Sequence, residues 1–182
     1  MIVFEAKRLI IMTPPHTASG MLHRISHAMG ALCVIGPTPD GYGFDQHFCG
    51  RCVCWEDFRR VVVWRNPCHR LTGLYFHHQW WAATQGWEPI CIEQFVQHVA
   101  TDDAEALSWF YRYNQSRWLG ATTVDDVIRY ENLQQDLSRV IEAQVRLPPR
   151  PIEHPPHEHV WNDRLRDLAS NWISEDERFA FF

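Results

Sequence analysis

Residues 61–75 read VVVWRNPCHRLTGLY, and this stretch decides the fold class. Its first four residues are all apolar, which is typical of a strand buried on both faces of a sheet. Asn66 and Pro67 then signal the start of a helix, because asparagine caps a helix N-terminus and proline fits its first turn. A buried strand that leads directly into a helix predicts a parallel sheet with helical crossovers.

Similar apolar runs occur at residues 9–12 and 31–35, and residues 124–130 are the candidate for a fourth strand. Segments long enough for helices lie between most of these runs. With 182 residues, the chain has the size of one globular domain. We therefore predict a single domain over residues 1–182, with a three-layer α/β/α architecture around a central, mainly parallel sheet.

Two further helices are expected from their start signals. Asn132 and Gln135 resemble a capping box, and an apolar stripe at helical spacing follows them up to the prolines at positions 148 and 149. Thr101 or Asp102 could cap another helix that runs to Asn114. Strands thus alternate with helices, as the α/β class requires.

The composition argues against several partners. The chain has 16 arginines and a single lysine, Lys7, against 22 acidic residues, and its formal net charge is −5. Such a balance gives no global attraction to nucleic acid or to anionic lipid. No apolar stretch approaches the roughly 20 residues of a membrane span, and the N-terminus lacks the apolar core of a signal peptide. We therefore expect a soluble, cytoplasmic protein with reduced cysteines and no nucleic-acid or membrane partner.

A loop of small residues follows the first apolar run. Residues 9–22 read LIIMTPPHTASGML, which places this loop between a strand and a helix. The unpaired amides and positive dipole end of a helix N-terminus bind phosphate or sulfate, and Thr17 and Ser19 would add hydroxyl donors. The loop lacks the spacing and the lysine of a Walker A motif. An ordinary strand-to-helix turn is the alternative interpretation.

Arg65 stands at the end of the apolar run that opens the decisive stretch. Ligands of open α/β sheets bind beyond the carboxyl ends of the strands, and an arginine there can fork onto a phosphate. Arg70 lies one turn into the following helix and could join it. A solvent-facing or salt-bridged side chain is the alternative for Arg70.

The two segments resemble the cofactor motifs of the sulfotransferases, in the branch that contains the carbohydrate sulfotransferases. The resemblance lies in HTASG at residues 16–20 and in RNPxxRLxxxY at residues 65–75, and it extends to residues 124–137 and 179–182. It implies a P-loop-NTPase-like sulfotransferase fold. It also implies transfer of a sulfuryl group from 3′-phosphoadenosine-5′-phosphosulfate to a hydroxyl of a carbohydrate or another small acceptor. The product nucleotide would be 3′-phosphoadenosine 5′-phosphate, and no metal would be needed.

The resemblance also assigns roles to residues. The first loop would hold the 5′-phosphosulfate through Pro15, His16, Thr17, Ala18, Ser19, Gly20 and Met21. Arg65 would hold the 3′-phosphate, together with a helix serine in the family. Gly73 occupies that serine position here, and Thr72 beside it could compensate. The family usually has a lysine at the position of His16, and a protonated or N–H-donating histidine could take its role.

Sulfuryl transfer also needs a base within reach of the acceptor hydroxyl. His47 is our candidate, because family members often carry a histidine in the segment that leads to the second motif. A surface or packed histidine is the alternative. Asp45, Glu56 and His78 are further candidates for the base. The expected catalytic residues are therefore His47 and His16.

Two clusters contain residue types that bind metals. Cys49, Cys52 and Cys54 have zinc-like spacing, but no second Cys-x2-Cys pair exists, and packed cysteines of a half-buried strand are favoured. The three histidines of residues 154–159 share their segment with two prolines, which prevent the helical spacing that would align ligands. We therefore expect no metal site.

Two other functions remain open. One is a catalytically silent homologue that binds the nucleotide or a protein partner, because His16 and Gly73 replace the usual lysine and serine. The other is a P-loop nucleotide kinase, which the missing lysine disfavours. The acceptor and the oligomeric state are left open.

Overall fold

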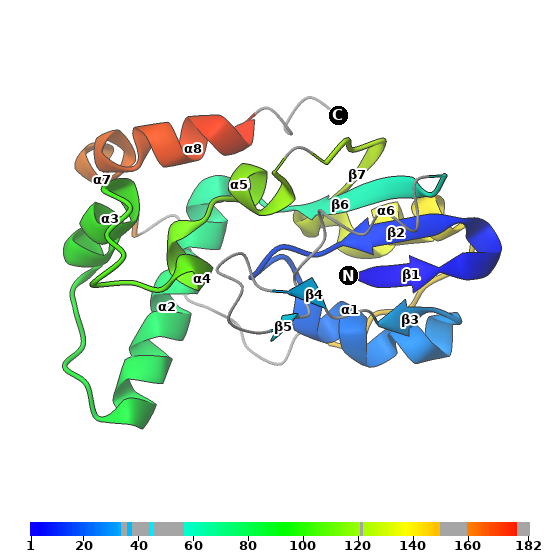
Figure 1. Cartoon of the computed structure of the whole chain (residues 1–182), viewed down its shortest axis with the longest axis horizontal. Helices are drawn as coiled ribbons and strands as arrows, with labels where there is room; N and C mark the ends of the chain where they lie inside the picture. Colours follow the sequence, from blue (N-terminus) through cyan, green and yellow to red (C-terminus); the bar gives the residue numbers. More distant parts are fainter. Residues whose placement is uncertain (34–35, 38–43, 46–56, 121, 150–159, 178–182) are drawn as a thin grey trace. The chain divides into compact units, whose positions relative to one another are not determined.

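The computed structural model describes residues 1–33, 36–37, 44–45, 57–120, 122–149 and 160–177 (Figure 1). Residue contacts divide the chain into two compact units. The first unit is formed mainly by Met1–Arg65 and Arg117–Pro149, and the second by Asn66–Ser116 and Arg150–Phe181. Each unit contains its own cluster of buried apolar side chains. The single domain over residues 1–182 stays a prediction.

The first unit is built on a mixed sheet. Among the described residues, this sheet has five strands in the order β3-β1-β2-β6-β7. The strands are β1 (Ile2–Phe4), β2 (Leu9–Met12), β3 (Leu32–Cys33), β6 (Arg59–Trp64) and β7 (Asp126–Arg129). β2, β6 and β7 are parallel neighbours, whereas β1 is antiparallel to both β2 and β3. A separate antiparallel pair is formed by β4 (Gly36–Pro37) and β5 (Phe44–Asp45).

The apolar runs predicted the positions of four strands. β2 occupies residues 9–12, β6 includes residues 61–64, and the runs at 31–35 and 124–130 contain β3 and β7. β1 was not predicted, because a three-residue strand is too short to show a period. The α/β class is confirmed. The sheet was expected to be mainly parallel. β1 pairs antiparallel with both of its neighbours, so the described sheet is mixed.

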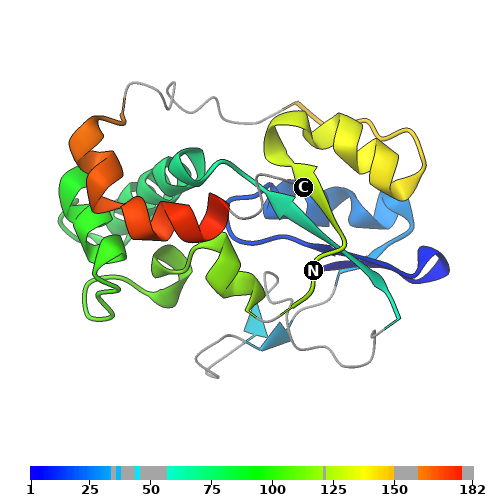
Figure 2. The same cartoon turned by 90° about the horizontal axis from the view of Figure 1, so that it is seen from above.

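The core of the first unit lies on one face of this sheet. Alternate strand residues, Ile11 among them, belong to the core cluster on that face. The helices α1 (Ser19–Ser26) and α6 (Leu133–Ile141) both pack there, through Leu22 and Leu137, and Figure 2 has both on the same side of the strands. Each such buried side chain stabilises the fold by roughly 1.5–3 kcal/mol. In the described part of the first unit, α1 and α6 thus cover the same face, and the second helical layer of the three-layer architecture stays a prediction. Ile10 and Val62, which alternate with the core residues along their strands, are also buried.

Both ends of α6 differ from the sequence prediction, which carried the helix up to the prolines at positions 148 and 149, whereas α6 ends at Ile141. The helix is preceded by a 3-10 turn over Tyr130–Asn132, and the Asn132 side chain makes no capping hydrogen bond. The predicted capping box is therefore wrong. At the other end, Glu142 takes a left-handed conformation, and its amide donates to the carbonyls of Arg139 and Ser138. This arrangement satisfies carbonyls that a helix end otherwise leaves open.

The second unit is helical. Its described helices are α2 (Pro67–Gln85), α3 (Ile92–Ala100), α4 (Trp109–Arg112), α7 (Asp163–Leu168) and α8 (Ser170–Glu177), and α5 (Gln115–Leu119) crosses the boundary between the units. α2 begins as predicted, because the Asn66 side chain accepts from the amides of Cys68 and His69 at 3.0 and 3.2 Å. None of the described helices is both long and apolar enough to cross a bilayer.

The predicted helix from Thr101 to Asn114 is wrong. Thr101 ends α3 instead, and the chain then turns before α4 begins. The Asp103 carboxylate accepts from the amides of Glu105 and Ala106, both at 3.1 Å. Aspartate side chains that bond to nearby backbone amides compete with helix formation, and this competition breaks the segment.

A buried charge network holds the second unit together. Arg70 is fully buried, and its Nη2 donates to the carbonyl of Tyr113 at 3.0 Å. Asp176 of α8 is also fully buried and accepts from the amides of Gln115 and Ser116 at 2.9 and 2.7 Å. Desolvation raises the pKa of Asp176, although the charge of Arg70 and these amides oppose the shift. Arg70 is therefore a buried structural arginine of the second unit, and the solvent-facing alternative for it is wrong.

Two adjacent histidines of α2 lie in an aromatic cluster of the second unit. The ring of His78 packs against Phe95 and Tyr111, with centroids 5.5 and 5.2 Å apart. His77 Nδ1 lies 3.0 Å from the Tyr111 hydroxyl, and burial raises the pKa of that hydroxyl to about 12. Burial, together with neighbouring histidine charges, lowers the pKa of both imidazoles below 6.5. Both rings are thus neutral in the folded protein at neutral pH.

Acidification is expected to destabilise the second unit. The unfolded chain takes up protons at the ordinary histidine pKa, whereas the folded chain resists them until lower pH. The contribution of these two histidines to the free energy of unfolding should therefore be intact above about pH 6.5 and should fall as the pH drops below that value. Urea unfolding at a series of pH values measures this fall. In His78→Phe the fall should be smaller, and an unchanged pH dependence in that variant would contradict the assignment.

Candidate functional site

The segment between β2 and α1 forms a tight turn, at the end of β2 where the strand leads into the helix (Figure 1). The Thr17 hydroxyl and amide both donate to the Pro14 carbonyl, at 2.6 and 3.2 Å. His16 and Ala18 have φ angles of 60° and 68°. This left-handed region costs a non-glycine residue roughly 1–2 kcal/mol. Two such residues in one short turn are the kind of backbone outlier that points to function.

The N-terminus of α1 opens directly behind this turn. The amides of Met21 and Leu22 donate to the Ala18 carbonyl at 3.1 and 3.0 Å. In the part of the chain that the structure describes, the amides of Ser19 and Gly20 donate to no acceptor. Ser19 is buried and Gly20 is exposed. The exposed amide at the positive end of a helix suits an anionic group.

Arg65 joins this turn to the end of β6. The side chain is only 4% exposed, and its Nη1 donates to the His16 carbonyl at 3.1 Å. Its guanidinium carbon lies 4.3 Å from the centroid of the Tyr130 ring, at the end of β7. The two predicted motifs therefore meet at the carboxyl ends of neighbouring parallel strands. In this state the arginine braces the turn through its hydrogen bond to the His16 carbonyl, and its guanidinium also packs against the Tyr130 ring.

The single lysine of the chain lies away from this site. Lys7 ends the 3-10 turn Glu5–Lys7, which precedes β2 at its amino end. Lys7 therefore lies at the opposite end of β2 from the turn. Positive charge next to the turn at residues 16–20 comes from Arg65 and from Arg24, whose Nε donates to the Gly20 carbonyl at 3.0 Å.

No model of a known protein family, no curated protein and no solved structure matches this chain. The resemblance to the sulfotransferases accordingly stays a hypothesis that rests on the residues of the two motifs.

Two predicted cofactor residues belong to the second unit. Gly73 is buried within α2, and Thr72 beside it is fully buried. The Thr72 hydroxyl donates to the Cys68 carbonyl at 2.9 Å and accepts from the Trp161 indole at 2.8 Å. Its proton is thus already used inside the unit. Thr72 does not supply the free hydroxyl that the missing serine would have provided.

The other predicted residues fall into three groups. Pro15 is buried, and Met21 packs against the core of the first unit. His78 is buried in the aromatic cluster of α2, which leaves it poorly suited to act as a base on a small acceptor. The candidates His47 and Glu56 lie outside the described residues, and of Asp45 only the backbone is described.

The candidate metal ligands in residues 49–54 and 154–159, like the motif at residues 179–182, also lie outside the described residues. Where side chains are described, no three histidine, cysteine, aspartate or glutamate residues gather in a way that could hold a metal ion.

Tyr130 is the site residue that sequence reasoning missed. The pairing of two strands could have predicted it. Trp64 and Arg129 are register partners on the parallel strands β6 and β7. The next residues along each strand, Arg65 and Tyr130, must then leave the sheet side by side. Pairing these two strands from the sequence would have predicted the contact.

Gly20 offers a local test of the turn. A Cβ built on Gly20 meets no atom within 4 Å, and its φ is not positive. Gly20→Ala is therefore expected to raise the free energy of unfolding by up to about 1 kcal/mol, because alanine favours the helix. Thermal unfolding measures the change. Gly30→Ala is the matched control, since Gly30 has equal space but a φ of +74°, and it should destabilise instead. Destabilisation by Gly20→Ala would contradict the open environment of the turn.

Proposed function

We propose that this chain binds 3′-phosphoadenosine-5′-phosphosulfate beyond the carboxyl ends of β2 and β6 and transfers its sulfuryl group to a hydroxyl of a carbohydrate or similar small acceptor. The observation that supports this proposal most is the hydrogen bond from Arg65 Nη1 to the His16 carbonyl at 3.1 Å. It joins the two segments that resemble the family's cofactor motifs. Ligands of open α/β sheets bind at this edge.

The residues present fit a doubly anionic nucleotide in charge and in donor type. The amide of Gly20 and the N-terminus of α1 would receive the 5′-phosphosulfate. Arg65 would receive the 3′-phosphate, because a phosphate is a stronger acceptor for a guanidinium than the neutral His16 carbonyl. The bound nucleotide supplies an activated sulfuryl group.

The chemistry of the chain's own residues would be electrostatic. Amide donors and a histidine N–H near the 5′-phosphate stabilise negative charge as it develops there. His16 takes this role in the proposal, because it stands where the family usually has a lysine. His47 is the proposed base that accepts the proton of the acceptor hydroxyl.

Binding of the same nucleotide without transfer is the second candidate function. Three observations favour it: Lys7 lies at the other end of β2, Gly73 lacks a hydroxyl, and the Thr72 hydroxyl is already bonded. Each removes a group that a transferase of this family would use. The fit of the turn and of Arg65 to a phosphate is the same in both functions.

Two measurements on the full chain separate these functions. Calorimetry with 3′-phosphoadenosine 5′-phosphate and with adenosine 5′-phosphate tests whether the 3′-phosphate strengthens binding. A sulfate-transfer assay with a panel of sugars then tests turnover. Preference for the 3′-phosphate with turnover supports the transferase, and the same preference without turnover supports the silent binder. Equal binding of the two nucleotides would contradict both.

A further inference from the structure

The first unit contains a pocket at the amino end of its parallel strands, far along β2 from the turn at residues 16–20. Its volume is about 290 Å³. Leu9 and Arg59, which open β2 and β6, are register partners at this edge. The pocket is lined by Ala6, Lys7, Leu9, Arg59, Val140 and Glu142. It therefore takes no part in the candidate nucleotide site.

The wall of the pocket carries charges of both signs. Lys7 and Arg59 come from the sheet side, and Glu142 comes from the end of α6. Within the described residues, neither Lys7 nor Glu142 forms an ion pair. Their opposite charges are thus both available to a ligand.

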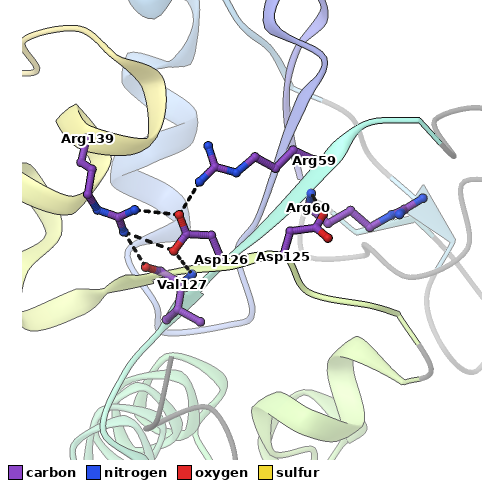
Figure 3. A network of polar contacts seen from close by, with 6 residues as sticks. All are labelled: Arg59, Arg60, Asp125, Asp126, Val127 and Arg139. Carbon is purple, nitrogen blue, oxygen red and sulfur yellow. Dashed lines mark hydrogen bonds and ion pairs between the residues drawn. The ribbon is translucent and has the colours of Figure 1, made fainter.

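Arg59 is held in place by a network at the same edge (Figure 3). Its guanidinium pairs with the Asp126 carboxylate, which also accepts from Arg139 Nη1 at 2.7 Å. Partial burial opposes ionisation of Asp126, but hydrogen bonds from Arg139 and the Val127 amide and the two arginine charges lower its pKa overall. Two arginines therefore share one carboxylate, and the network keeps one net positive charge beside the pocket.

Glu142 occupies a costly position. It lies in the left-handed region at φ 52°, where a residue with a side chain is strained. It also adds a negative charge at the carboxyl end of α6, where the helix dipole is already negative and favours cations. The Glu142 carboxylate and the negative end of the helix dipole concentrate negative potential on one side of the pocket, opposite the positive charge of Lys7 and Arg59.

We propose that this pocket binds a small zwitterion, an α-amino acid, with its carboxylate toward Lys7 and Arg59 and its ammonium toward Glu142. Ala6, Leu9 and Val140 supply apolar surface for the side chain of the ligand. The volume is at the small end of ligand pockets and suits a molecule of this size. The proposal goes beyond the nucleotide site, and binding of 3′-phosphoadenosine 5′-phosphate should not depend on it.

The probes that test this proposal are L-leucine and two blocked forms of it. N-acetyl-L-leucine lacks the ammonium, and L-leucine methyl ester lacks the carboxylate. Calorimetry on the full chain at millimolar ligand should detect L-leucine and should find each blocked form weaker by about tenfold or more. Failure of L-leucine to bind overturns the proposal. Equal binding of N-acetyl-L-leucine also overturns it, because the pocket is then a simple anion site.

Three variants connect this binding to the pocket. Lys7→Met and Glu142→Gln should each lower the affinity for L-leucine by about tenfold or more, since each substitution removes one charged partner of the ligand. Both residues are exposed, so the fold should persist. Arg8→Gln is the matched control, because Arg8 pairs with Asp57 and does not line the pocket. The affinity of Arg8→Gln for L-leucine should stay within about twofold of the wild-type affinity. An equal loss in Arg8→Gln, or no loss in the other two variants, overturns the proposal.

Discussion

Replacing Arg65 with methionine is expected to remove most of the preference for a 3′-phosphorylated nucleotide and to leave the first unit folded. Methionine keeps an apolar side chain of similar length beside Tyr130 but has no group that can bind phosphate. Loss of a charged hydrogen-bond partner of this kind costs about 1.5–3 kcal/mol, or roughly 10–150-fold in affinity. Calorimetry with 3′-phosphoadenosine 5′-phosphate measures the loss.

Two further variants separate binding from folding. Arg65→Ala also removes the side chain that packs against the Tyr130 ring, and it should lower the free energy of unfolding by about 2–3 kcal/mol. Arg146→Met is the matched control for charge, since Arg146 is an exposed arginine of the same unit. The affinity of Arg146→Met for the nucleotide should stay within about twofold of the wild-type affinity. Wild-type affinity in Arg65→Met would show that the guanidinium does not hold the 3′-phosphate.

Replacing Asp176 with alanine should be the most destabilising single change in the second unit. The substitution leaves the amides of Gln115 and Ser116 without their buried acceptor. It also removes the carboxylate whose charge interacts with the fully buried guanidinium of Arg70. Breaking one side of such a buried arrangement costs about 3–5 kcal/mol. Urea unfolding followed by tryptophan fluorescence measures this loss, because Trp161 and Trp172 lie in the same core.

Asp176→Asn is the matched control for this change. The amide oxygen of asparagine can still accept one of the two backbone hydrogen bonds. The free energy of unfolding should therefore fall less than it does for alanine. The raised pKa of Asp176 adds a second readout. The folded state holds this proton more tightly than the unfolded state. Its contribution to stability therefore declines as the pH rises above about 3.9, the ordinary aspartate value, and asparagine abolishes that decline. Equal stability of wild type and Asp176→Ala would contradict the network.

Local signals in the sequence were sufficient for the elements that meet at the candidate site. The apolar run before Arg65 and the cap and proline that follow it correctly predicted β6 and the start of α2. The rule that ligands gather at the carboxyl ends of parallel strands led us to expect Arg65 near the turn at residues 16–20. The hydrogen bond from Arg65 to His16 agrees with that expectation.

The errors arose where tertiary contacts or short-range side-chain bonds decide the structure. The helix expected from Thr101 is absent because Asp103 bonds to the backbone that follows it. The Thr72 hydroxyl was expected to be available, but the distant Trp161 occupies it. β1 and the burial of Arg65 depend on pairing and packing between segments far apart in the chain, and no local pattern reports these.

The central claim is that the turn before α1 and the arginine after β6 form one anion site. Nuclear magnetic resonance on protein labelled with ¹⁵N-glycine tests it most directly, with the Gly20 amide assigned by Gly20→Ala. The Gly20 signal should shift with 3′-phosphoadenosine 5′-phosphate, and this shift should need a higher nucleotide concentration in Arg65→Met. A Gly20 signal that does not move while the nucleotide binds elsewhere would contradict it.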